Sequence, residues 1–128
     1  MAYLIDTDVA IHLRDGDATV SAKLAVLDGA IVMSIITRIE LEGGVYRHPE
    51  QAALRRARLD EILMAVPALA FDSASADAYA SIVAHAGYSR RKILDRMIAA
   101  QALLHRSTLI TLNGADYMDI PGLQLLAW

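Results

Sequence analysis

The chain has 128 residues and a formal net charge of −3, and 55% of its residues are hydrophobic. This length fits one domain spanning residues 1–128, which can bury a core without covalent cross-links. The chain has no cysteine, and this excludes disulfides, thiolate metal sites and a cysteine nucleophile. Proteins that bind nucleic acid through bulk charge are usually basic, so the acidic balance argues against a simple nucleic-acid-binding module.

The N-terminal sequence MAYLIDTD has no basic segment and no long apolar run, so it does not predict a signal peptide. No apolar stretch approaches the roughly 20 residues that a membrane-spanning helix needs. Together with the absence of cysteine, these features lead us to expect a cytoplasmic protein that does not enter a membrane.

Short apolar runs alternate with helical patterns along the chain. The first run, Ala2–Ile5, is continuous and ends in Asp6, which predicts a strand buried on both faces. Further strands are predicted at 30–33 and 108–111, with weaker candidates at 68–71 and 124–126. Helical patterns cover 20–27, 35–46, 49–66, 79–86 and 93–105, with Ser34 as a predicted N-cap and Gly87 as a stop. Strands that alternate with helices predict an α/β fold with a parallel sheet.

Three of the four segments that carry the candidate acids lead from or towards a predicted strand end. These acids form the candidate site: Asp6, Glu40, Asp95 and Asp116. In open α/β sheets the ligand site lies beyond the carboxyl ends of the strands, so we expect these side chains to converge on one pocket. Clustered carboxylates repel one another, and such a cluster persists only when cations neutralise it. Oxygen ligands suit Mg²⁺ or Mn²⁺, ions that support phosphoryl chemistry.

Each acid also has an ordinary structural interpretation, and Glu40 could simply be a surface helix residue. Asp6 could simply cap a helix, since an aspartate after a strand often does so. Asp95 could be a charge that the dipole favours near a helix N-terminus. Asp116 could belong to a turn, because the dipeptide Asn113-Gly114 marks a turn by itself.

Two glutamates compete for one position in the candidate site. Glu40 and Glu42 lie about 200° apart on a helix, so at most one of them can face the pocket. Thr37 shares the face of Glu40, and a small hydroxyl beside a carboxylate suits a metal site. Glu42 is spaced for an ordinary ion pair with Arg38. We therefore predict that Glu40 is the ligand.

The basic and imidazole side chains give weaker signals. The run Arg90, Arg91 and Lys92 is typical of a solvated helix start, with a phosphate or RNA contact as the alternative. The histidines lack metal-ligand spacing and are expected at a surface or an interface: His12, His48, His85 and His105.

Four segments, in this order, resemble motifs of the PIN domain family, and in particular of the VapC-type toxins of bacterial toxin–antitoxin pairs. They are YLIDTDVAI at 3–11, SIITRIELEG at 34–43, DRMIAAQA at 95–102 and TLNGADY at 111–117, and the chain closes with a Pro-Gly-Leu stretch and Trp128. Tyr117 stands where the family usually has Phe. Residues 91–94 stand where it often has small or polar residues.

The resemblance implies a twisted parallel sheet flanked by helices, and a Mg²⁺- or Mn²⁺-dependent endoribonuclease that is the toxin of a type II toxin–antitoxin system. It implies Asp6, Glu40, Asp95 and Asp116 as the catalytic, metal-binding acids, with Thr7, Thr111 and Asn113 as polar neighbours. It also implies a homodimer and a small VapB-type antitoxin. An anionic pocket favours a partner that inserts an arginine. The alternatives are a catalytically inactive PIN-like protein-binding module and a metal-dependent phosphatase.

Overall fold

The computed structural model describes residues 2–128, in which five strands form one sheet of order β3-β2-β1-β4-β5. The strands are β1 (Ala2–Ile5), β2 (Ala30–Ser34), β3 (Ala68–Leu69), β4 (Thr108–Thr111) and β5 (Leu125–Ala127). Every pairing between neighbours is parallel, and β1 lies between β2 and β4. The predicted α/β class with a parallel sheet is therefore confirmed, and both weaker strand candidates are strands.

Helices connect the strands. They are α1 (Thr7–Arg14), α2 (Ala18–Ala25), α3 (Ile35–Arg47), α4 (Ala52–Ala65), α5 (Ser73–Ala86) and α6 (Ile93–Leu104), with short 3₁₀ helices η1 (Pro49–Gln51), η2 (Arg90–Lys92) and η3 (Gly114–Tyr117). Among residues 2–128, none of these helices combines the length and the apolar character needed to cross a membrane.

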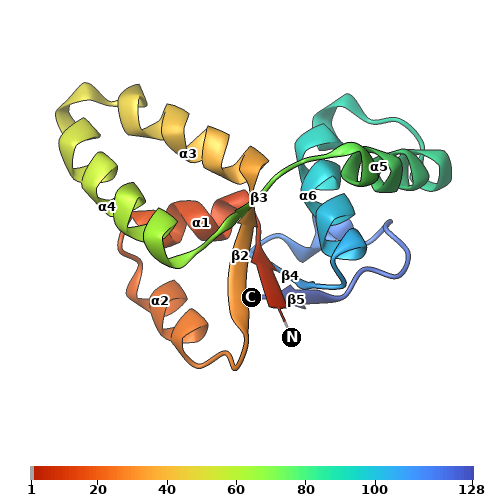
Figure 1. Ribbon diagram of the computed structural model, residues 1–128, viewed down its shortest axis with the longest axis horizontal. Helices are drawn as coiled ribbons and strands as arrows, with labels where there is room; N and C mark the ends of the chain where they lie inside the picture. The colour runs from red at the N-terminus through yellow and green to blue at the C-terminus, as the bar shows by residue number, and fades with distance from the viewer. Residues whose placement is uncertain (1) are drawn as a thin grey trace.

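The sheet lies between two layers of helices, α1 to α4 on one face and α5 and α6 on the other (Figure 1). Consecutive strand residues point to opposite faces. Ile5 accordingly packs into the same cluster as Val9 and Leu41, whereas Leu4 packs with Ile98 on the opposite face. Burial on both faces explains why the central strands are continuous apolar runs.

Four helices differ from the sequence prediction, and one of them, α5, begins at Ser73 rather than at residue 79 because Asp72 caps the amide of Ser75. The apolar pattern does not predict α1, because its eight residues are shorter than the roughly 11-residue window in which a helical period becomes visible. The segment predicted as one helix over 49–66 is η1 followed by α4. Helix α2 begins before residue 20 because the side chain of Asp17 caps the amides of Thr19 and Val20.

Two predicted helix ends are confirmed. The Ser34 hydroxyl accepts a hydrogen bond from the Ile36 amide at 3.0 Å and so caps α3. Gly87 ends α5 with φ of +85°, a conformation that glycine adopts without strain.

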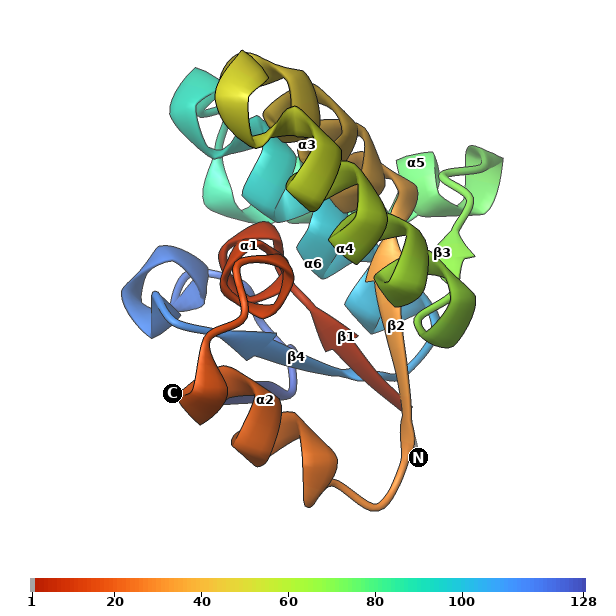
Figure 2. The ribbon, with the colours of Figure 1, turned by 90° about the vertical axis from the view of Figure 1, so that its left-hand side faces the viewer.

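The topology brings two strand ends together at the centre of the sheet. Ile5 pairs with Ile110, so the carboxyl ends of β1 and β4 lie side by side. From β1 the chain moves outward to β2 and β3 and then returns to β4 on the other side of β1. Such a switch point leaves a crevice beyond the strand ends. In Figure 2, α1 leaves β1 with the α3–α4 hairpin above it and α2 below.

Candidate functional site

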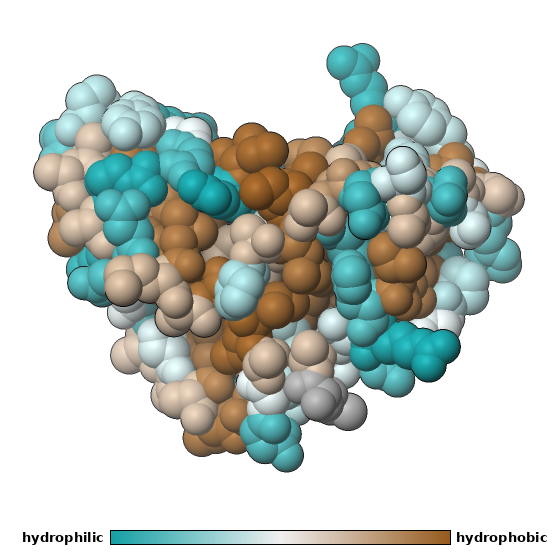
Figure 3. Space-filling view, in the orientation of Figure 1, coloured by the Kyte–Doolittle hydropathy of each residue, from teal (hydrophilic) through white to brown (hydrophobic). Residues whose placement is uncertain are grey.

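An acidic cleft of about 280 Å³ opens beyond the carboxyl end of β1. Its lining comes from the start of α1, from α3, from η2 and from α6: Asp6, Thr7, Asp8, Ile11, Glu40, Arg90, Arg91, Leu94 and Asp95. The surface of the molecule is hollowed between its α3–α4 side and its α5–α6 side (Figure 3). Three of the four acids singled out in the sequence thus line one cleft, although they lie far apart in the chain.

Asp6 is the most deeply buried of these acids, with 4% of its surface exposed. One carboxylate oxygen, Oδ1, accepts the amide of Val9 at 3.0 Å and caps α1. The other, Oδ2, accepts the hydroxyl of Thr111 at 2.6 Å. Capping and a place in the cleft are therefore compatible, because each uses a different oxygen.

The hydroxyl of Tyr117 lies between two of the carboxylates. It is 3.3 Å from Asp6 Oδ2 and 3.4 Å from Asp95 Oδ1, and the ring is buried. A phenol has one proton, so it donates to one carboxylate at a time. The resemblance to the family marks Tyr117 only as a mild departure from the usual Phe, and nothing in the sequence shows this contact between α6 and the C-terminal segment.

Glu40 and Glu42 have different partners, as the helical spacing predicts. Glu40 lies at the rim of the cleft, where Thr7 Oγ1 donates to its Oε1 at 3.2 Å. Thr7 Oγ1 is also 3.1 Å from the hydroxyl of Thr37, which is fully buried. Glu42 lies outside the lining, and its Oε2 accepts Nε of Arg38 at 3.4 Å.

Asp8 is a cleft residue that no pattern in the sequence singles out. Its Oδ2 accepts the side-chain amide of Asn113 at 2.6 Å, and the backbone amide of Asn113 donates to Thr111 Oγ1 at 2.9 Å. Asp8 stands in the first turn of α1, directly beyond Asp6 and Thr7. Prediction of α1 would have placed it at the same end of the sheet.

Two of the charged candidates lie outside the cleft lining. Asp116 is exposed on η3 and has no place in the lining, although its charge raises the pKa of Asp95. Lys92 Nζ pairs with Asp119 Oδ2 at 3.3 Å, whereas Arg90 and Arg91 line the cleft. The four histidines have surface positions on the helices and their ends, as predicted.

Burial raises the pKa of Asp6, Glu40 and Asp95, and neighbouring negative charges raise it further. The charge of Asp8 raises the pKa of all three acids, and the charge of Asp95 raises the pKa of both Asp6 and Glu40. The hydrogen bond from Thr111 opposes the shift at Asp6. Without a cation, the cleft therefore carries unfavourable electrostatic energy that a divalent ion would relieve.

The donor atoms of the cleft fit a hydrated divalent ion. Among residues 2–128, no three acidic or histidine side chains lie close enough together to coordinate one metal ion without further ligands. Mg²⁺ commonly takes only one or two carboxylates from a protein and keeps several waters. Asp6 and Asp95, which share the hydroxyl of Tyr117, with Glu40 at the rim, provide oxygen ligands of this kind.

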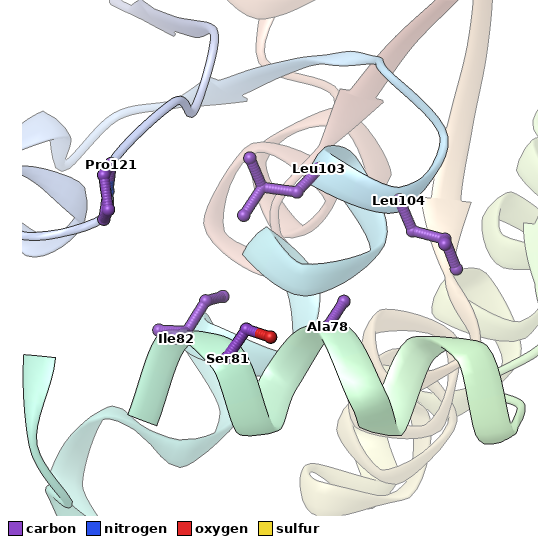
Figure 4. Close-up of a pocket in the computed structure, with 6 residues that line it drawn as sticks. All are labelled: Ala78, Ser81, Ile82, Leu103, Leu104 and Pro121. Atoms are coloured by element: carbon purple, nitrogen blue, oxygen red, sulfur yellow. The ribbon is translucent and has the colours of Figure 1, made fainter. Parts of the chain in front are cut away.

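A second cavity, of about 300 Å³, lies between α5, α6 and the C-terminal segment (Figure 4). Its lining is Ala78, Ser81, Ile82, Leu103, Leu104 and Pro121. The hydroxyl of Ser81 is the one side-chain polar group of this lining, and none of the six residues is titratable. The acidic cleft, and not this apolar cavity, is therefore the candidate site of chemistry.

Comparison with known proteins identifies the family. Residues 3–121 match the family model described as PIN domain. A chain of VapBC2 from Rickettsia felis, solved bound to a promoter DNA fragment, is similar with a TM-score of 0.87 and 23% identity, covering 100% of this chain and 99% of that one. A chain of a toxin–antitoxin complex from Klebsiella pneumoniae is similar with a TM-score of 0.76 and 25% identity, and the match covers 98% of this chain and 96% of that one. A chain of FitAcB from Neisseria gonorrhoeae is similar with a TM-score of 0.82 and 27% identity, and the match covers 97% of this chain and 96% of that one. No curated protein sequence matches. Because the family model covers most of the chain, the protein belongs to the PIN domain family.

Proposed function

We propose that this PIN domain protein is a Mg²⁺- or Mn²⁺-dependent endoribonuclease and the toxin of a type II toxin–antitoxin pair. The acidic cleft carries this proposal, because Asp6, Glu40 and Asp95 meet there with raised pKa at the carboxyl end of β1. A divalent ion held there would supply an activated water and offset the negative charge at the phosphate.

The residues of the cleft orient the carboxylates and attract the substrate. Thr111 and the α1 amide of Val9 fix both oxygens of Asp6, and Thr7 orients Glu40. Arg90 and Arg91 line the same cleft, and their positive charges favour a phosphodiester in spite of the net charge of −3. Water adds to phosphorus and the bond to the 3′ oxygen breaks, which leaves a 5′-phosphate and a 3′-hydroxyl.

The test is cleavage of an end-labelled single-stranded RNA in Mg²⁺, in Mn²⁺ and in excess EDTA. We expect cleavage only with metal, and near-complete loss of activity in Asp6→Asn and in Asp95→Asn, which keep the shape and remove the charge. Asp77→Asn is the matched control, because Asp77 is exposed on α5, outside the acidic cleft. Undiminished cleavage in EDTA would contradict the proposal.

The same assay separates the alternatives. Hydrolysis of p-nitrophenyl phosphate without cleavage of RNA would indicate a metal-dependent phosphatase. Turnover of neither substrate, by a folded protein that binds a protein partner, would indicate a catalytically inactive binding module. Both results differ from the metal-dependent RNA cleavage that we expect.

We further propose that a VapB-type antitoxin inhibits the enzyme by placing an arginine in the acidic cleft. Arginine forms bidentate pairs with carboxylates, and Leu94, which is 46% exposed in the lining, offers an apolar contact beside them. Substitution of that arginine by alanine in the antitoxin should restore RNA cleavage. A complex that leaves Asp6, Glu40 and Asp95 open to solvent would contradict this mode of inhibition.

We also propose that the free toxin is a cytoplasmic homodimer, as the resemblance to VapC-type toxins implies. Large apolar side chains lie exposed and could supply contact area, among them Val26 (81%), Tyr46 (65%) and Met64 (90%). Light scattering should give twice the chain mass of 13.9 kDa. A mass of one chain at micromolar concentration would refute the dimer, and cell fractionation tests the location.

A further inference from the structure

A third cavity region, distinct from the apolar cavity at α5 and α6, lies beside the acidic cleft between α1 and the α3–α4 hairpin. Its first part, of about 460 Å³, shares Ile11 and Glu40 with the acidic cleft and is therefore adjacent to it. Its walls carry three arginines, Arg14 from α1, Arg47 from α3 and Arg55 from α4.

The next cavity, of about 380 Å³, continues in the same direction. It shares Asp15 and Arg55 with the first part and adds Arg58. We name the two cavities together the arginine groove, defined by Arg14, Arg47, Arg55 and Arg58. In a chain with 12 lysines and arginines and a net charge of −3, this is a local concentration of positive charge beside an acidic site.

Arg14 is a largely buried arginine that pairs with Asp15 through Nε and leaves its terminal nitrogens without a protein partner among residues 2–128. It is 4% exposed, and its one side-chain hydrogen bond within residues 2–128 runs from Nε to Asp15 Oδ1 at 3.1 Å. Its two terminal nitrogens donate to no protein group in that part of the chain, and the residue lines the groove. Neither terminal nitrogen is among the fully buried side-chain atoms of residues 2–128 that lack a partner, so both remain accessible from the groove, where an anion would pair with them.

Gly44 makes room for this guanidinium. A Cβ atom at position 44 would lie 2.7 Å from Arg14 Nη1, closer than two such atoms approach. On the other side, Arg55 Nη1 donates to the carbonyl of Gly44 at 2.8 Å. The guanidinium groups of Arg14 from α1 and Arg55 from α4 therefore both lie next to Gly44 of α3.

We propose that the arginine groove binds the phosphates of the RNA strand on one side of the cleaved bond, an inference that rests on the proposed ribonuclease function. Helix α1 places Arg14 about 12 Å from Asp6 along its axis, at roughly 1.5 Å per residue. A strand with one phosphodiester in the acidic cleft spans that distance within a few nucleotides. An acidic protein segment is the competing occupant. RNA is favoured because the groove opens into the cleft in which a phosphodiester must lie.

The experiment compares two substrates, a 12-nucleotide RNA and a dinucleotide that is too short to reach Arg14. The variants are Arg14→Gln, the double variant Arg47→Gln/Arg55→Gln, and Gly44→Ala, which displaces the guanidinium of Arg14 and favours the helix. Arg38→Gln is the matched control, because it removes the same charge from α3 outside the groove.

For the 12-nucleotide RNA we expect KM to rise about tenfold in each groove variant with kcat unchanged, because the groove lies away from the reacting atoms. The dependence of log KM on log salt should become shallower by about one for each phosphate that the variant no longer binds. The dinucleotide should be cleaved equally by all the proteins, and the control should match wild type on both substrates.

The two possible failures are distinguishable. If wild type cleaves the 12-nucleotide RNA and the groove variants show the same KM and salt dependence, the groove inference is overturned and the ribonuclease function stands. If wild type cleaves neither substrate, both fail. If RNA kinetics are unchanged while the variants lose antitoxin binding, the groove belongs to an acidic protein segment. Should Arg14→Gln fail to fold, the double variant and Gly44→Ala decide the outcome.

Discussion

Asp6 uses its two carboxylate oxygens for different tasks. Oδ1 caps α1 through the amide of Val9, and Oδ2 faces the hydroxyls of Thr111 and Tyr117 in the cleft. Asparagine can keep the capping oxygen while it removes the charge. Asp6→Asn therefore tests the chemistry of the cleft with little disturbance of the helix that begins there.

The Tyr117 hydroxyl offers a second test at the level of single atoms. Because it lies between Asp6 and Asp95, we expect it to hold the two carboxylates in the orientation that suits a divalent ion. Tyr117→Phe should weaken Mn²⁺ binding by about tenfold, the effect typical of groups that orient metal ligands. Titration calorimetry measures this directly, with Tyr79→Phe on α5 as the control. Equal Mn²⁺ affinity in both variants would show that the hydroxyl has no such role.

The two glutamates of α3 provide a matched pair. Glu40 lies at the rim of the cleft and Glu42 pairs with Arg38 and Arg56 outside it. Glu40→Gln should lower kcat/KM at least about tenfold, or roughly 1.4 kcal/mol of transition-state stabilisation. Glu42→Gln should leave activity near wild type, because exposed ion pairs contribute little. Steady-state RNA cleavage by both variants at one Mg²⁺ concentration is the measurement. If Glu42→Gln instead lost most of its RNA cleavage activity, the candidate metal ligand would have to be assigned to the other face of α3.

The raised pKa of Asp6 predicts how stability depends on pH. Burial and nearby acids raise the pKa of Asp6 in the folded protein above 3.8, the ordinary pKa of an aspartate in the unfolded chain. The folded protein therefore holds the Asp6 proton more tightly than the unfolded chain does. As pH rises above about 4, the unfolded chain ionises first, so the metal-free protein loses stability until Asp6 is also ionised in the folded state. Asp6→Asn should lack this loss. Urea unfolding of both proteins in EDTA from pH 4 to 8 should show a difference that grows in favour of the variant. A difference independent of pH would contradict it.

At the scale of elements, the central sheet is predictable from the sequence and α1 is not. The strands β1, β2 and β4 are buried on both faces, so their apolar runs stand out in the sequence. Helix α1 is too short to show its period, and without it Asp8 is not recognised as a cleft residue.

Contacts between distant elements are the part that sequence patterns miss. Tyr117 reaches Asp6 across the fold, and Gly44 of α3 makes room for Arg14 of α1. Neither pair has a fixed spacing in the chain, because each depends on how two elements pack. Motif order could place Asp6, Glu40 and Asp95 near the same sheet edge, but it could not show that Asp116 lies outside the cleft lining.

The start of α3 sets the position of both Thr37 and Glu40. Ser34 is fully buried, and its hydroxyl caps the amide of Ile36 at 3.0 Å. Ser34→Ala should lower the free energy of unfolding by about 1 kcal/mol, the usual cost of removing a cap. Urea denaturation measures this change, with Ser73→Ala at the exposed start of α5 as the control. Equal stability of the two variants would mean that the cap contributes nothing measurable.

At the scale of the whole molecule, opposite charges gather around one strand end. The acids gather where α1 leaves β1, Arg90 and Arg91 line the same cleft, and the arginine groove extends between α1 and the α3–α4 hairpin. A net charge of −3 therefore conceals basic side chains both in the acidic cleft and in the groove adjacent to it. This arrangement suits a polyanion that must be held along its length and neutralised at one phosphate.

The acidic cleft also predicts how the stability of the molecule responds to metal. Mg²⁺ or Mn²⁺ should raise Tm of the wild-type protein at pH 7, because the ion binds the folded state and relieves repulsion between carboxylates with raised pKa. The gain should reach about 2.7 kcal/mol at a metal concentration one hundred times Kd. Asp95→Asn should lose most of this response and should be at least as stable as wild type in EDTA, whereas Asp77→Asn should respond fully. Thermal unfolding over a range of Mn²⁺ concentrations gives all these values. A wild-type Tm that does not change with metal, or an equal rise in Asp95→Asn, would show that the ion is not held by the acids of this cleft.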